Sequence, residues 1–107
     1  MFNPFLFKGF EPSHEFSQAS NLVLSAALEL APRDAISFGY ISKSKSDFRG
    51  HLEICSSHGV FSAFAAAGDP ETVLSKLRAR ILKQLKRWKR SSFPPIPAAR
   101  PAGAAFA

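Results

Sequence analysis

The sequence contains a single cysteine, Cys55, among its 107 residues. An intrachain disulfide is therefore excluded, and a reducing compartment is expected. The first ten residues are apolar but include Pro4 and Lys8 and have no basic leader, so we do not expect a signal peptide. Charged residues also interrupt every apolar run before it reaches the length that spans a bilayer. These features predict a cytoplasmic protein without a membrane partner.

The sequence also lacks the common signatures of catalysis. His14, His51 and His58 are not at metal-ligand spacing, and no second cysteine accompanies Cys55. There is no glycine-rich phosphate loop. His51, Glu53 and Cys55 share one face of a predicted strand and suggest a Cys-His nucleophile pair, but neighbouring residues on one strand face often meet by chance. We expect no enzyme, no metal, no cofactor and no small-molecule substrate.

Acidic residues are absent from the last third of the chain. All eight acids lie at or before Glu71, and nine Lys or Arg residues follow it, in a chain of net charge +6. A surface that serves only solubility mixes both signs. The one-sided distribution predicts an anionic partner, which is a nucleic acid, an anionic membrane or an acidic protein.

The chain alternates between strand-like and helix-like segments. Ser13 is a helix N-cap candidate and Pro32 ends the helix that follows it. Asp69, Pro70 and Glu71 mark the start of a second helix. The predicted strands are 5–10, 35–43, 51–55 and 60–68, and the predicted helices are 14–31 and 69–90. The alanines of 60–68 leave a helix as the alternative there.

This β-α-β-β-β-α order predicts an α+β two-layer fold. A right-handed crossover pairs the first two strands in parallel, and hairpins join the others into a four-stranded sheet. Both helices then cover one face of that sheet. We expect one domain over residues 1–92 and a flexible Pro/Ala-rich tail over 93–107, where four prolines prevent regular pairing.

The second helix combines an apolar and a basic stripe. Leu74, Leu77, Ile81, Leu85 and Trp88 recur at helical spacing and are predicted to pack on the sheet. A basic ridge, roughly opposite, is then available for RNA phosphates. A membrane surface is the less favoured alternative, because the sheet already uses the apolar stripe. The candidate RNA-binding residues are Lys76, Arg80, Lys83, Lys86, Arg87, Lys89 and Arg90.

Residues 59–90, GVFSAFAAAGDPETVLSKLRARILKQLKRWKR, resemble the closing segment of ribosome hibernation-promoting factors. This is the ribosome-associated inhibitor (protein Y) family, also described as sigma-54 modulation proteins. In that family a strand rich in small residues leads through an acidic turn into a helix with a Lys-Leu-x-Arg-Gln-Leu-x-Lys-x-Lys pattern. Arg80, Lys83, Arg87 and Lys89 match its basic positions.

The resemblance implies a domain similar to a double-stranded-RNA-binding domain. Such a factor binds the small ribosomal subunit between head and body, through ribosomal RNA, and keeps idle ribosomes silent under stress by occupying the space of mRNA and tRNA. The chain looks like a short form without the second, dimerising domain, so we expect a monomer off the ribosome. Segment 14–31 departs from the family pattern because it contains no Lys or Arg.

Three alternatives remain open at the level of sequence. The runner-up function is a regulatory protein-interaction module whose basic helix binds an acidic partner protein. Lys43, Lys45 and Arg49 either extend the basic surface or belong to a solvated loop. A set of aromatic residues either forms a stacking platform for single-stranded bases or, as we expect for so thin a core, mostly faces the helices. These aromatic residues are Phe38, Tyr40, Phe61 and Phe64.

Overall fold

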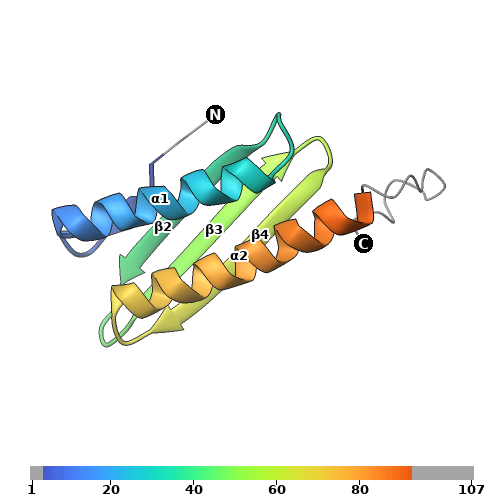
Figure 1. Cartoon of the computed structure of the whole chain (residues 1–107). Coiled ribbons are helices and arrows are strands. Elements are labelled where there is room, and N and C mark those ends of the chain that lie inside the picture. The colour runs from blue at the N-terminus through green and yellow to red at the C-terminus, as the bar shows by residue number, and fades with distance from the viewer. Residues whose placement is uncertain (1–3, 93–107) are drawn as a thin grey trace.

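A computed structural model of the chain describes residues 4–92 (Figure 1). The predicted order of elements and the α+β class are confirmed. Segment 60–68, where a helix was the alternative, is a strand. The elements are β1 (Leu6–Lys8), α1 (His14–Leu30), β2 (Ile36–Lys43), β3 (Phe48–Ser56), β4 (Gly59–Ala67) and α2 (Pro70–Ser92).

The four strands form one sheet in the order β1-β2-β3-β4. β1 pairs with β2 in parallel, and the remaining neighbours are antiparallel. Both helices lie on the same face of the sheet, and α2 runs along β3 and β4 (Figure 1). The predicted parallel crossover and the two-layer arrangement are therefore confirmed. None of the helices in the described part of the chain is long and apolar enough to cross a membrane.

The element boundaries differ from the prediction at both ends of the sheet. β1 is shorter than 5–10 because Gly9 turns the chain with a φ of 83°. β3 begins at Phe48, opposite Lys43, because a hydrogen bond from Ser44 N to Asp47 O (2.7 Å) closes a tighter loop than the composition suggested. At the other end, Gly59 has the positive φ expected of the β3–β4 hairpin, 134°. The predicted tail, 93–107, lies outside the described residues.

Local capping fixes the two helices. The Ser13 hydroxyl accepts a hydrogen bond from Phe16 N (3.0 Å), so Ser13 is the N-cap of α1 as predicted. Asp69 has the same role before α2: its carboxylate accepts from Thr72 N (2.8 Å) and from the Thr72 hydroxyl (3.1 Å). These hydrogen bonds hold the pKa of Asp69 below its usual value, because they favour the charged form.

The core lies between the helices and the sheet. Alternation along the strands sends every second side chain toward the helices, where the α1 and α2 stripes meet them. Gly50 permits a close approach of α2, because a Cβ at this position would lie 2.6 Å from Val73 Cγ1. The largest fully buried side chains of the core are those of Leu24, Ile41, Leu52, Ile54, Leu77, Ile81, Leu85 and Val73.

Candidate nucleic-acid interface

The apolar stripe of α2 anchors the helix on the sheet. Leu77, Ile81 and Leu85 are fully buried, and Leu74 is nearly so. Trp88 is partly buried and packs edge-on against Phe61, with ring centroids 6.0 Å apart. The predicted stripe is thus confirmed, and Val73, which the prediction omitted, joins it. This packing fixes which side of α2 faces solvent.

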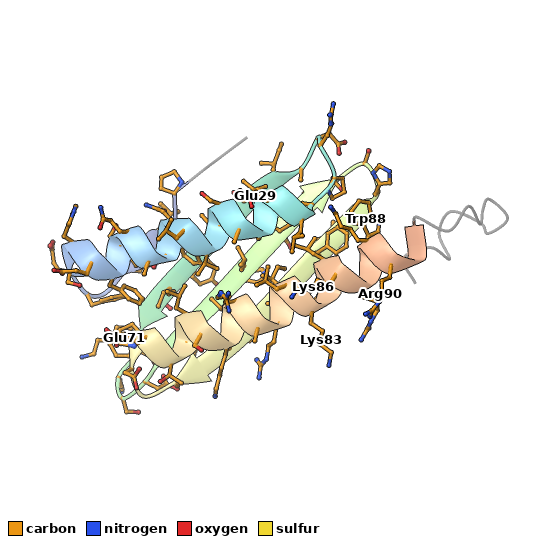
Figure 2. All side chains as sticks on the ribbon, viewed as in Figure 1. Glu29, Glu71, Lys83, Lys86, Trp88 and Arg90 are labelled. Atoms are coloured by element: carbon orange, nitrogen blue, oxygen red, sulfur yellow. The ribbon has the colours of Figure 1, made fainter. Side chains whose placement is uncertain are left out.

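The basic side chains of α2 lie on its solvent-facing side. Six of the seven candidate residues are exposed, whereas Lys89 is partly buried. Figure 2 shows Lys83 and Arg90 on the side of α2 that faces away from α1. No acid follows Glu71, which Figure 2 shows at the opposite end of α2 from Arg90. We define this exposed set as the basic face: Lys76, Arg80, Lys83, Lys86, Arg87 and Arg90.

Two members of the basic face also contact the sheet. Lys76 Nζ donates to Ala66 O (3.4 Å), and the Arg80 guanidinium donates to Phe64 O. Both acceptors are backbone carbonyls on the outer edge of β4, which among residues 4–92 pairs only with β3. Lys76 and Arg80 therefore reach from α2 toward the edge of β4.

Gln84 completes this contact with the strand edge. Its side-chain amide accepts from Ser62 N (3.0 Å) and donates to Ser62 O (2.5 Å). An unpaired strand edge invites association with other chains, and side chains that occupy its backbone groups suppress this. Lys76, Arg80 and Gln84 thus have a structural function in addition to any function in binding.

The spacing of these three residues explains the contact. Four residues of helix rise about 6 Å, and two residues of strand rise about 6.6 Å. Steps of four along α2 therefore stay in register with alternate residues of β4, which runs in the opposite direction. The sequence carried this signal as the i, i+4 series Lys76, Arg80 and Gln84, but the strand edge that it faces was not predicted.

The three basic residues around the β2–β3 loop, Lys43, Lys45 and Arg49, lie away from most of the basic face. The β2–β3 loop is at the end of the sheet where α2 begins, far from the C-terminal end of α2 (Figure 1). Lys43 Nζ lies 5.7 Å from the centre of the Phe48 ring, and Arg49 Nε lies 3.6 Å from Asp47 Oδ1. Lys45 is exposed. The loop therefore does not extend the densest part of the basic face.

The aromatic prediction was largely wrong. Of the four aromatic residues, only Phe61 is buried beneath the helices. Phe38 and Phe64 are 45% and 58% exposed, and Tyr40 is partly exposed. The register explains the error, because Gly39 and Ile41 occupy the helix-facing positions of β2 and leave the aromatic positions on the uncovered face.

The strand bearing Cys55 does not form a nucleophile pair. The Cys55 thiol lies 3.7 Å from Glu53 Oε1, while His51 contacts the rings of Tyr40 and Phe64. Desolvation, together with the Glu53 carboxylate, raises the pKa of the Cys55 thiol, which disfavours the reactive thiolate. Within residues 4–92, no cluster of three or more His, Cys, Asp or Glu side chains can hold a metal ion.

The described residues therefore define a two-layer α+β domain with a basic helix beside one sheet edge. Several solved structures share this fold, among them the following two. One is the Protein Y N-terminal domain of Thermus thermophilus, with a TM-score of 0.62 and 14% sequence identity over 78% of this chain and 94% of that chain. The other is a ribosomal subunit interface protein from Coxiella burnetii, with a TM-score of 0.61 and 13% identity over 80% and 97% of the two chains.

No protein-family model and no curated protein sequence matches this chain. The fold expected from the resemblance of residues 59–90 is confirmed, because the chain shares it over nearly the whole length of both structural neighbours.

Proposed function

We propose that this protein is a non-catalytic ribosome-associated factor of the cytoplasm that binds RNA of the small ribosomal subunit and restrains translation. The observation that carries the proposal is the basic face of α2, which is exposed along the helix and free of acidic residues after Glu71. Phosphates are the ligands that best match such a rigid array of cations. The fold that the chain shares with a ribosomal subunit interface protein supports this choice of RNA.

In this proposal the apolar stripe and Gly50 hold α2 rigidly on the sheet, and the basic face contacts phosphates. Lys83, Lys86, Arg87 and Arg90 supply contacts through their exposed side chains, as do Lys76 and Arg80, whose side chains also contact β4. Lys89 contributes at the border of the face. The protein acts as a monomer off the ribosome, and residues 1–92 are the ribosome-binding domain.

Sucrose-gradient sedimentation of the tagged protein in a cell extract tests the proposal. We expect the protein to migrate with small subunits or whole ribosomes and to move to the top of the gradient at high salt, because phosphate contacts are salt-dependent. A translation assay with purified ribosomes should show inhibition on addition of the protein. A complex that survives complete nuclease digestion would instead favour an acidic protein partner.

A further inference from the structure

Four rings form a continuous row across the face of the sheet that the helices leave uncovered. Phe38 contacts Tyr40, Tyr40 contacts His51, and His51 contacts Phe64, with ring centroids 6.1, 5.8 and 6.1 Å apart. We call these four residues the aromatic row. The aromatic row belongs neither to the buried core nor to the basic face, so its exposure on the surface needs a separate explanation.

The pairing register places the row on this face. Tyr40 lies opposite His51, and His51 lies opposite Phe64, so these three rings cross three adjacent strands side by side. Leu6 of β1 lies opposite Tyr40 and continues the row to the far edge of the sheet, where it is half exposed. Contiguous exposed apolar surface of this kind on a small domain marks an interaction site.

The charges around the row favour an anionic partner. Lys8 and Arg49 occupy the same face of the sheet, two residues along the strand from Leu6 and His51 respectively. Arg49 is partly neutralised by Asp47, whose Oδ1 lies 3.6 Å from Arg49 Nε, so Lys8 is the stronger of the two contributions. At the β4 edge, Arg80 contacts the carbonyl of Phe64 and links the row to the basic face. Glu53 is the one acid at an uncovered-face position of the four strands. A second copy of the chain would bring another net charge of +6 to this surface and be repelled.

We propose that the aromatic row binds the bases of a single-stranded RNA segment, whose phosphates continue across the β4 edge toward the basic face. Bases without a pairing partner stack on exposed aromatic side chains, and a sheet surface is a suitable platform for several of them. Stacking adds affinity that does not depend on salt, whereas the basic face adds the salt-dependent part. The inference rests on the proposed function only in taking RNA as the nucleic acid.

The test measures binding of a fluorescently labelled oligouridylate of about ten nucleotides by anisotropy, over a range of salt concentrations. The double variant Phe38→Ala/Phe64→Ala should bind at least about tenfold more weakly, because each stacked base contributes strongly to affinity. Its salt slope should equal that of the wild type, since no phosphate contact is lost. Both side chains are exposed, so a thermal melt should show that the variant remains folded.

Two control variants match this change. Leu22→Ala removes an exposed apolar side chain from the outer face of α1, and Val60→Ala removes one from the uncovered face outside the row. Both should bind the oligouridylate as the wild type does. An effect of Leu22→Ala equal to that of the double variant would overturn the assignment of the row.

The remaining outcomes separate the row from the proposed function. If the folded double variant binds the oligouridylate with unchanged affinity, the proposal that the aromatic row binds bases is overturned. The proposal is also overturned if the wild-type protein dimerises in analytical ultracentrifugation and the double variant loses the dimer but keeps RNA binding. In that case the aromatic row binds a second copy of the chain. A wild-type protein that migrates with ribosomes but does not bind the oligouridylate overturns the row alone. Oligouridylate binding that weakens in the double variant, without migration on ribosomes, supports the row and contradicts the proposed function.

Discussion

Substituting Gly50 by alanine tests how closely α2 approaches the sheet. The added Cβ would lie 2.6 Å from Val73 Cγ1 and 2.8 Å from Leu77 Cδ1, and both are buried side chains of the α2 stripe. Both side chains are fully buried, so they can move aside only if the core around them repacks. Overpacking of this kind costs about 1–3 kcal/mol. Alanine also reduces the conformational entropy of the unfolded chain, which stabilises the folded state by about 0.4–1 kcal/mol. We therefore expect a net loss of about 1–2 kcal/mol in the free energy of unfolding.

Thermal unfolding followed by circular dichroism measures this change. A loss of about 1–2 kcal/mol lowers the Tm of a domain of this size by roughly 5–15 °C. Gly68→Ala is the matched control, because a Cβ there meets no atom within 4 Å and the φ of Gly68 is not positive. The control should be neutral or slightly stabilising. A Gly50→Ala variant as stable as this control would show that α2 does not pack on β3 as described.

Three further variants test other parts of the account. Trp88→Ala should lower the free energy of unfolding by about 2 kcal/mol, less than a fully buried Trp, because its partly exposed ring packs on Phe61; an unchanged thermal melt with weaker ribosome binding would place Trp88 on the RNA instead. Gln84→Ala should cost about 1 kcal/mol in urea unfolding and increase concentration-dependent association in light scattering, because it uncovers the β4 edge at Ser62. Deleting 93–107 should leave the melt unchanged and alter the salt slope of ribosome binding by no more than about one unit, since only Arg100 is lost from the basic set; a collapsed melt would contradict the domain boundary at residue 92.

The sequence was sufficient for the class and order of elements because periodicity and capping agree. Ser13 and Asp69 begin the helices where expected, and Gly59 takes the positive φ that the hairpin requires. The α2 stripe was predictable for the same reason, since only one face of a helix carries Leu77, Ile81 and their neighbours at the correct spacing.

The two faces of the sheet were harder to assign. In β2, Phe38 and Tyr40 alternate with Gly39 and Ile41, so either set fits a buried face by composition. The structure resolves this because the Phe5 ring packs against Gly39, where a Cβ would lie 2.9 Å from a ring carbon. A long-range contact of this kind, between β2 and the residue just before β1, leaves no local pattern in the sequence.

The sequence predicted which basic residues belong to the candidate site, but it did not predict how they are arranged on the sheet. Spacing placed Lys76 and Arg80 on one stripe, but their hydrogen bonds to β4 depend on how far α2 lies from the strand edge. The same geometry gives Gln84 a function that its residue type alone did not indicate. The sequence thus predicted which residues are exposed together. The packing of α2 on the sheet determines which of them also form hydrogen bonds with β4.

Binding of the charge-reversal variant Lys83→Glu/Arg87→Glu to purified small ribosomal subunits tests the central claim most directly. Both side chains are exposed, so the fold should be retained. The matched control is Arg33→Glu/Lys45→Glu, which makes the same change in net charge at exposed positions outside α2. If the basic face binds ribosomal RNA, the α2 variant should lose co-sedimentation, or reduce the salt slope of binding by about two units, while the control binds nearly as the wild type does. Equal binding by the folded α2 variant and the control would contradict the account.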